Sequence, residues 1–153
     1  LCVRCGNCAQ ACPSHIIQPD FGGSGLAGLL TPRLRFDEDY CREDCHGCNQ
    51  VCPSGAIARL TLADKQRRVI GRAAVDLNRC LLAQGRECTA CIQKCPDHAI
   101  VMHTNNGGFS NEPRVIPSRC NGCGACEAVC PTRPTRAIRV QPLAMPRALS
   151  NRR

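Results

Sequence analysis

The sequence predicts an α+β fold of two tandem lobes, in which short strands and helices surround a core that side chains alone do not fill. Three observations lead to this prediction. Cysteine supplies 16 of the 153 residues, whereas only 3% are aromatic and none is tryptophan. Aromatic side chains usually contribute much of a buried core, so a chain this poor in them needs another source of cohesion. The cysteines also recur in similar motifs, and short apolar runs flank these motifs.

Four motifs share one pattern, in which four closely spaced cysteines are followed by a proline. Motif 1 contains Cys2, Cys5, Cys8 and Cys12, motif 2 contains Cys41, Cys45, Cys48 and Cys52, motif 3 contains Cys80, Cys88, Cys91 and Cys95, and motif 4 contains Cys120, Cys123, Cys126 and Cys130. Motifs 1 and 4 have the regular spacing C-x2-C-x2-C-x3-C-P, while motif 2 opens with three intervening residues and motif 3 with seven. With their prolines the motifs span residues 2–13, 41–53, 80–96 and 120–131, and no cysteine is left over.

Each motif is expected to begin in a loop, continue into one or two helical turns and end where the proline returns the chain to an extended path. An apolar pair then opens a short strand. These pairs are Ile16-Ile17, Ala56-Ile57, Ala99-Ile100 and Ala137-Ile138. Strand-like runs also precede three motifs, at residues 34–36, 74–76 and 115–117. The repeated unit is therefore strand, Cys loop, helical turns and strand.

The connections between motifs differ in composition. Residues 19–32 are rich in glycine, and the polar stretch 60–71 contains residues 63–66, which favour a short helix. Residues 103–113 are typical of a turn or loose loop. We expect residues 1–140 to form the folded module and residues 141–153 to form a basic, disordered tail.

This cysteine spacing is typical of ligands to 4Fe–4S clusters. A loop with two residues between cysteines can wrap three thiolates around one face of a cubane, with backbone N–H groups aimed at its sulfurs. The fourth cysteine lies on the helical turn, and in two-cluster ferredoxins it ligates the other cluster. We therefore expect all sixteen cysteines to be iron ligands of four 4Fe–4S clusters in bacterial-type ferredoxin-like lobes.

The motifs must then work in pairs, and two pairings are open. Sequential pairing joins motif 1 with motif 2 and motif 3 with motif 4, whereas nested pairing joins motif 1 with motif 4 and motif 2 with motif 3. Because the outer two motifs are regular and the inner two irregular, symmetry favours nesting. Nesting predicts that Cys130 joins the first three cysteines of motif 1, Cys12 those of motif 4, Cys95 those of motif 2 and Cys52 those of motif 3.

Other readings of these motifs are weaker. Zinc sites usually use two distant C-x2-C pairs, and cysteines in a tight loop rarely fit disulfide geometry. The C-x3-C-x2-C opening of motif 2 matches radical S-adenosylmethionine enzymes, but the chain has no room for their barrel. Residues 23–28 match G-x-G-x-x-G, yet Pro32 would stop the helix that a dinucleotide site requires. The histidines His15, His46, His98 and His103 are not needed as ligands.

The net charge of +8 does not indicate a nucleic-acid protein. An oxidised 4Fe–4S core with four thiolates carries about −2, so four clusters would offset the excess of arginine. Aromatic residues that stack on bases are also missing from the basic segments. The chain has no apolar run long enough for a transmembrane helix and no signal peptide. Because Cys2 opens the first motif directly after Leu1, we expect a fragment or mature chain that lacks an N-terminal part.

Several segments resemble the MauM/NapG-type polyferredoxins. These segments are Arg4–Cys8, Gly25–Pro32, Ile70-Gly71 with Val75-Asp76, and Cys80–Cys88. The chain is also similar to the C-terminal module of polyferredoxins that are fused to transmembrane helices. The resemblance covers residues 1–141, and the one departure is residues 132–136, which lengthen the link after motif 4 without changing a ligand.

The resemblance implies electron transfer between a membrane quinol-linked donor and a redox enzyme. It implies redox protein partners, a membrane-bound partner or a missing N-terminal membrane region, and a membrane-associated or periplasmic location, with the cytoplasmic face left open. We expect no catalytic residue, no small-molecule substrate and no nucleic-acid partner, although the chain could serve as a subunit of an oxidoreductase complex. An iron–sulfur sensor that binds DNA is the alternative function, and salt-dependent DNA affinity of the holo form would reveal it.

Overall fold

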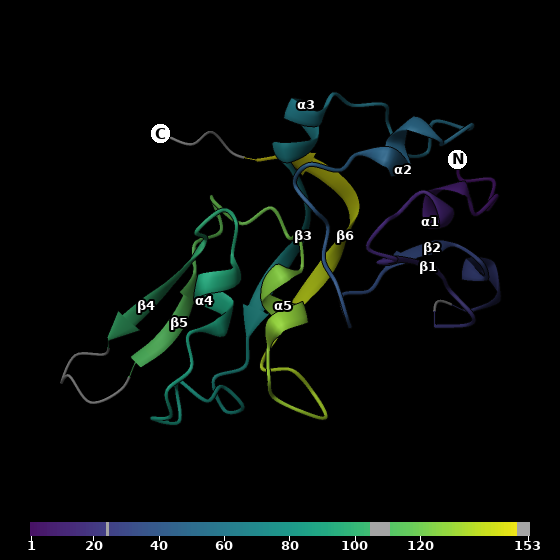
Figure 1. Ribbon diagram of the computed structural model, residues 1–153. Coiled ribbons are helices and arrows are strands. Elements are labelled where there is room, and N and C mark those ends of the chain that lie inside the picture. The colour runs from purple at the N-terminus through teal and green to yellow at the C-terminus, as the bar shows by residue number, and fades with distance from the viewer. Residues whose placement is uncertain (24, 105–110, 150–153) are drawn as a thin grey trace. The chain divides into compact units, whose positions relative to one another are not determined.

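The computed structural model describes residues 1–23, 25–104 and 111–149, and it has an α+β fold made of short elements (Figure 1). The chain divides into two compact units, Leu1–Gln66 and Arg67–Arg153, called unit 1 and unit 2 below. Unit 1 contains motifs 1 and 2, and unit 2 contains motifs 3 and 4. Each unit thus holds two motifs that are consecutive in the sequence.

Unit 1 is built from two helical turns, a small sheet and one further helix. Its elements are α1 (Asn7–Gln10), β1 (Ile17–Pro19), the 3-10 turn η1 (Leu26–Gly28), β2 (Pro32–Leu34), α2 (Gly47–Gln50) and α3 (Leu62–Gln66). Strands β1 and β2 are antiparallel, with Ile17 opposite Leu34. The helices α1 and α2 pack against each other, and each carries cysteines of its motif. The buried side chains of Ile16, Ile17 and Phe36 form the small apolar core.

Unit 2 repeats this plan with longer strands. Its elements are β3 (Arg68–Val75), α4 (Ala90–Lys94), β4 (Ile100–Thr104), β5 (Asn111–Val115), α5 (Ala125–Val129) and β6 (Ile138–Ala148). Strand β3 pairs antiparallel with β6, and β4 pairs antiparallel with β5. Figure 1 shows α4 and α5 side by side, and α4 contacts β4 while α5 contacts β6. The two motif helices therefore pack on each other and each on one of the two sheets, which also contact each other through β3 and β5.

The expected pattern of loop, helical turn and strand is confirmed for motifs 1, 3 and 4, and the short helix at 63–66 is confirmed by α3. After motif 2 the prediction is wrong, because residues 56–57 adopt bends instead of a strand. There the Ile57 N–H donates a hydrogen bond to the Cys52 sulfur at 3.4 Å, and this bond turns the chain back toward its own motif.

Two expected loops are partly strand. Residues 141–148, expected to be disordered, extend β6, because β3 offers them a partner from Gly71 opposite Pro142 to Arg68 opposite Ala148. Residues 103–104 and 111–113 continue β4 and β5, with His103 opposite Glu112. Residues 105–110 of that predicted loop and residues 150–153 of the predicted tail lie outside the described residues.

The loop of motif 4 is fastened to strand β3 by contact between two glycines. The Ile70 N–H donates to Asn121 O at 2.8 Å. A Cβ built on Gly122 would lie 2.3 Å from Gly71 O, and Gly122 also has a φ of +77°. Only glycine satisfies both conditions, because it lacks a Cβ and adopts positive φ freely. The glycine pair therefore sets how closely β3 can approach the cysteine loop.

Candidate metal centres

Two cavities in unit 2 are lined by cysteines from both motifs. Cavity A is lined by Cys80, Cys88 and Cys91 of motif 3 together with Cys130 of motif 4. Cavity B is lined by Cys120, Cys123 and Cys126 of motif 4 together with Cys95 of motif 3. Each cavity thus combines the first three cysteines of one motif with the fourth cysteine of the other.

This arrangement contradicts nested pairing. Nesting required Cys130 to join motif 1 and Cys95 to join motif 2, whereas both lie with cysteines of unit 2. The physical reason is the packing of α4 against α5, which places the last cysteine of each helix at the loop of the other motif. The spacing symmetry on which nesting was based does not determine which helices pack together.

Unit 1 also brings cysteines of its two motifs close together. The sulfur of Cys48 is close enough to Cys41, Cys12, Cys45 and Cys8 for their thiolates to repel its own. The Cys41 thiolate is likewise affected by Cys12. Cys12, the last cysteine of motif 1, is thus a neighbour of both Cys41 and Cys48 of motif 2. The Cys8 thiolate is affected by Cys2 and Cys5 of its own motif.

Burial and crowding make these thiolates unfavourable without a compensating positive charge. Burial, followed by repulsion from neighbouring cysteines, raises the pKa of Cys48 to about 11. The same two causes raise the pKa of Cys91 to about 11. Burial also raises the pKa of Cys123 to about 12, and repulsion from Cys95 contributes. A group that carries positive charge between the sulfurs would remove both penalties.

Backbone N–H groups point at several of the cysteine sulfurs. Cys95 Sγ accepts a hydrogen bond from Ala99 N at 3.3 Å, and Cys2 Sγ accepts one from Arg4 N at 3.4 Å. At Cys52 the bond from Ile57 is the main reason that the pKa of this thiol is lowered. Such donors stabilise negative charge on sulfur, as expected around an anionic cluster.

The last cysteine of motif 4 has an additional side-chain donor. Thr132 Oγ1 accepts a hydrogen bond from Ala137 N at 2.7 Å and lies 3.2 Å from Cys130 Sγ. Burial raises the pKa of Cys130, but the hydrogen bonds from Thr132 and from backbone amides outweigh burial and lower it overall. The residues that depart from the family pattern, 132–136, thus include a group that contacts a ligand. Sequence reasoning missed this role, although a hydroxyl two residues after a ligand was a visible signal.

The surroundings of the sulfurs in unit 2 fit a 4Fe–4S cluster. Within residues 1–23, 25–104 and 111–149, no group of three or more His, Cys, Asp or Glu side chains is placed to hold a metal ion. In unit 2 the sulfurs line cavities, with apolar side chains such as Val75 and Ile138 beside them. Thiolates, apolar walls and N–H donors are the surroundings in which proteins hold iron–sulfur clusters.

The structure also rejects the dinucleotide reading of residues 23–28. The only helical element that follows in this described stretch is the single 3-10 turn η1, after which β2 begins at Pro32. The radical S-adenosylmethionine reading of motif 2 is disfavoured as well, because Cys12 lies beside Cys41 and Cys48 and can occupy the iron that such enzymes leave open.

A fold of short elements around cysteine-lined cavities, with cysteines exchanged between consecutive motifs, defines the class of iron–sulfur proteins of the ferredoxin type. The model of the 4Fe-4S dicluster domain matches residues 1–56 and 85–133, which contain most of the four motifs. The chain therefore belongs to the family of 4Fe-4S dicluster ferredoxin-type proteins that includes NapG, NapF and MauM. The predicted resemblance is thereby confirmed.

Relatives in this family match most of the chain. It is 37% identical to the ferredoxin-type protein NapG of Escherichia coli K12, over 94% of this chain and 65% of the relative. It is 34% identical to the ferredoxin-type protein NapF of the same organism, over 85% and 71%. It is 35% identical to the methylamine utilization ferredoxin-type protein MauM of Methylobacillus flagellatus, over 92% and 62%. The chain thus spans about two thirds of the length of NapG.

Proposed function

We propose that the protein is an electron carrier that holds four 4Fe–4S clusters, two in each unit. The observation that carries this proposal is the exchange of fourth cysteines in unit 2, where Cys130 lies with motif 3 and Cys95 with motif 4. Two clusters that share such an arrangement must be close neighbours, and closeness permits rapid electron transfer between them. When bound, the clusters supply the one-electron chemistry.

Each cluster takes three cysteines from one motif and the fourth cysteine from its partner motif. A cluster is named below after the motif that supplies three of its cysteines. The proposed ligand sets are Cys2, Cys5, Cys8 and Cys52; Cys41, Cys45, Cys48 and Cys12; Cys80, Cys88, Cys91 and Cys130; and Cys120, Cys123, Cys126 and Cys95. The third and fourth sets follow the lining of cavities A and B. The second follows the proximity of Cys12 to motif 2, and the first follows by analogy.

The residues of the chain then have defined roles. The thiolates hold iron, the backbone N–H groups at Cys2, Cys52 and Cys95 stabilise the negative charge that a reduced cluster gains, and the apolar walls limit the access of water. These residues bind and tune the clusters. The carrier could also act as a subunit of an oxidoreductase complex whose active site lies on another chain.

We further propose that a membrane quinol-linked component donates the electrons and that a redox enzyme accepts them. This proposal rests on the likeness to NapG and MauM, and with it comes a membrane-associated or periplasmic location. No helix in the described part of the chain is long and apolar enough to cross a bilayer. A membrane-bound donor would therefore have to be a separate protein or a segment outside the chain described.

Iron and acid-labile sulfide, measured per chain after anaerobic reconstitution, test the cluster proposal. The proposal predicts about 16 iron and about 16 sulfide atoms, because each cubane contributes about four of each. About 12 of each would show that one motif holds no cluster, and the irregular motif 3 would be examined first. The absence of labile sulfide would exclude 4Fe–4S clusters altogether.

The donor proposal has its own test. Membranes from a strain that expresses related redox proteins are supplied anaerobically with a reduced quinone analogue and mixed with the oxidised holoprotein. We expect the visible absorbance of the clusters to bleach with these membranes, and not with the quinol alone. Equal rates with and without membranes would contradict a membrane donor while leaving the cluster assignment intact.

A further inference from the structure

The irregular loop of motif 2 is held by a helix that lies outside the cysteine motifs. Between Cys41 and Cys45 this loop has three residues, and Cys45 N donates to Arg42 O at 3.4 Å. Lys65 of α3 donates a second hydrogen bond to the same Arg42 carbonyl. The next residue, Gln66, donates from Nε2 to Glu43 O at 3.3 Å. The end of α3 therefore binds the carbonyl groups of the enlarged loop.

The local sequence places Lys65 there. The Thr61 hydroxyl caps the start of α3, because it accepts a hydrogen bond from Asp64 N at 3.1 Å and donates one to Asp64 Oδ2 at 2.8 Å. This N-cap fixes the start of a very short helix. Lys65 N donates to Thr61 O at 2.9 Å, so Lys65 belongs to the first complete turn. The cap thus orients Lys65 toward the loop.

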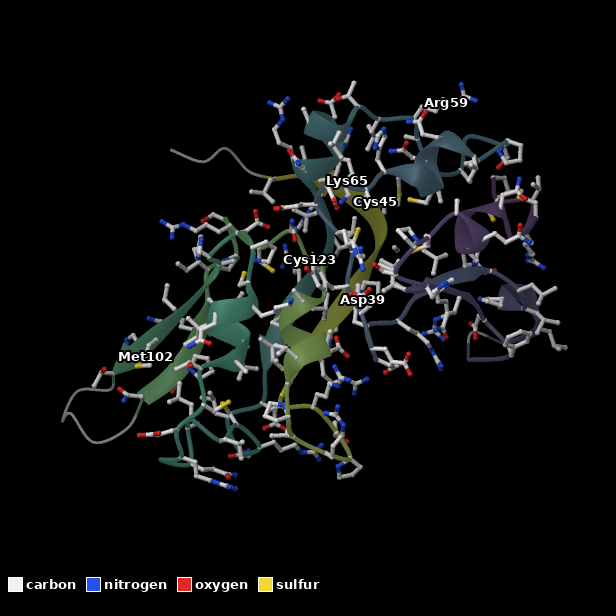
Figure 2. The ribbon with its side chains drawn as sticks, in the orientation of Figure 1. Asp39, Cys45, Arg59, Lys65, Met102 and Cys123 are labelled. Atoms are coloured by element: carbon white, nitrogen blue, oxygen red, sulfur yellow. The ribbon has the colours of Figure 1, made fainter. Side chains whose placement is uncertain are left out.

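The ammonium group of Lys65 also lies near a proposed ligand. It binds the carbonyl oxygen of Arg42, the residue that follows Cys41. Figure 2 shows Lys65 beside Cys45. Lys65 is half-buried, whereas the charged residues of the loop itself, 42–44, are exposed. The field of a half-buried charge is screened less by water and salt.

In motif 1, the regular motif of the same unit, a different group lies beside the first cysteine. There the backbone N–H of Arg4, two residues after Cys2, donates to the Cys2 sulfur. In motif 2 the ammonium group of Lys65 is instead held at the carbonyl of Arg42, one residue after the corresponding first cysteine, Cys41. Motif 1 thus has a neutral amide at this position, whereas motif 2 has a cation, which stabilises negative charge more strongly.

We propose that Lys65 is a positioning residue for the motif 2 cluster. Lys65 holds the enlarged loop of this motif and raises the reduction potential of its cluster. Reduction adds one electron from the donor to the cluster, and the positive charge of Lys65 stabilises the more negative product. This inference rests on the proposed function, because it requires a cluster at motif 2.

The test is a redox titration of the reconstituted holoprotein, followed by electron paramagnetic resonance, in wild type and in Lys65→Gln. We expect one of the four midpoints to fall, so that the ratio of reduced to oxidised cluster at a fixed potential drops about tenfold, equivalent to about 59 mV for one electron. The matched control is Arg59→Gln, which removes the same charge from an exposed arginine of the same unit, also labelled in Figure 2. We expect the control to leave all midpoints unchanged.

The outcomes separate this inference from the proposed function. If wild type lacks about 16 iron, the proposed function fails. If wild type holds this iron, two results would overturn the role of Lys65 alone: no shifted midpoint in Lys65→Gln, or an equal shift in Arg59→Gln. If Lys65→Gln loses iron, the Lys65→Arg variant tests whether a positive charge at this position is sufficient. Full iron and an unshifted midpoint with arginine support the proposal, whereas loss of the cluster with arginine as well contradicts it.

Discussion

At the scale of single residues, the hydrogen bonds to sulfur distinguish one motif from another. The four motifs have similar cysteines, yet their donors differ: a backbone N–H at Cys2 and Cys95, and a threonine hydroxyl at Cys130. Because such bonds stabilise the reduced form, clusters with identical ligands can differ in reduction potential. A gradient of potential along the chain would follow from these differences.

Replacement of Thr132 tests the threonine donor. Thr132→Val keeps the shape of the side chain but removes the hydrogen bond to Cys130 and leaves Ala137 N without its acceptor. We expect the midpoint of the motif 3 cluster to fall and the unit to lose about 1–2 kcal/mol of stability. Redox titration and denaturant unfolding measure the two effects. Thr132→Ser, which retains the hydroxyl, is the control, and an equal loss in both variants would contradict the role of the hydroxyl.

Glu127 is the buried carboxylate of unit 2. It is 9% exposed, and its Oε2 accepts a hydrogen bond from Val140 N at 2.6 Å, which ties α5 to β6. Because a charged acceptor is involved, we expect Glu127→Ala to destabilise the unit by about 2–3 kcal/mol. The rate at which guanidinium bleaches the clusters measures this effect. Glu127→Gln keeps an acceptor and should bleach more slowly than the alanine variant; equal rates would show that the bond to Val140 contributes little.

At the scale of elements, the close approach of β3 to the motif 4 loop depends on Gly122. Gly122→Ala would force a Cβ against the Gly71 backbone and strain a positive φ, so we expect a loss of about 3 kcal/mol or more. Gly85→Ala is the matched control, because Gly85 has a φ of +76° but open space around it. It should cost about 1 kcal/mol. Thermal unfolding that ranks the two variants equally would contradict the packing role.

The elements also show what sequence could and could not predict. Helical turns after each Cys loop, the short helix near Lys65 and all candidate ligands could be identified, because spacing and local propensity determine them. The pairing of the motifs could not be predicted, because it depends on which helices pack together. The cysteine spacing does not indicate that α1 packs on α2 and α4 on α5. The strand at 141–148 was missed because it contains two prolines, which are rare inside strands, and because its partner β3 lies about 70 to 80 residues earlier in the sequence.

At the scale of the whole molecule, we expect the proposed clusters to contribute more cohesion than apolar packing does. In the described residues no large side chain is less than 2% exposed, and half of the buried apolar residues are cysteines or alanines. The apolar core of each unit is therefore small. Metal binding would therefore supply much of the folding free energy.

Removal of iron tests this dependence. We expect a chelator under reducing conditions to abolish most secondary structure in both units, because free thiols and small cores cannot hold the chain together. Circular dichroism before and after chelation measures the change. A chain that keeps its strands and cooperative thermal unfolding without iron would show that apolar packing is sufficient.

The central claim is that the clusters form two neighbouring pairs, one in each unit. Electron paramagnetic resonance of a dithionite-reduced double variant tests it most directly. Cys5→Ala with Cys123→Ala disables one cluster in each unit, so sequential pairing predicts that the two remaining clusters are isolated and give sharp signals without spin–spin broadening. Cys88→Ala with Cys123→Ala disables both clusters of unit 2 and should leave the pair in unit 1 broadened. Broadening that survives in the first variant and disappears in the second would contradict the account.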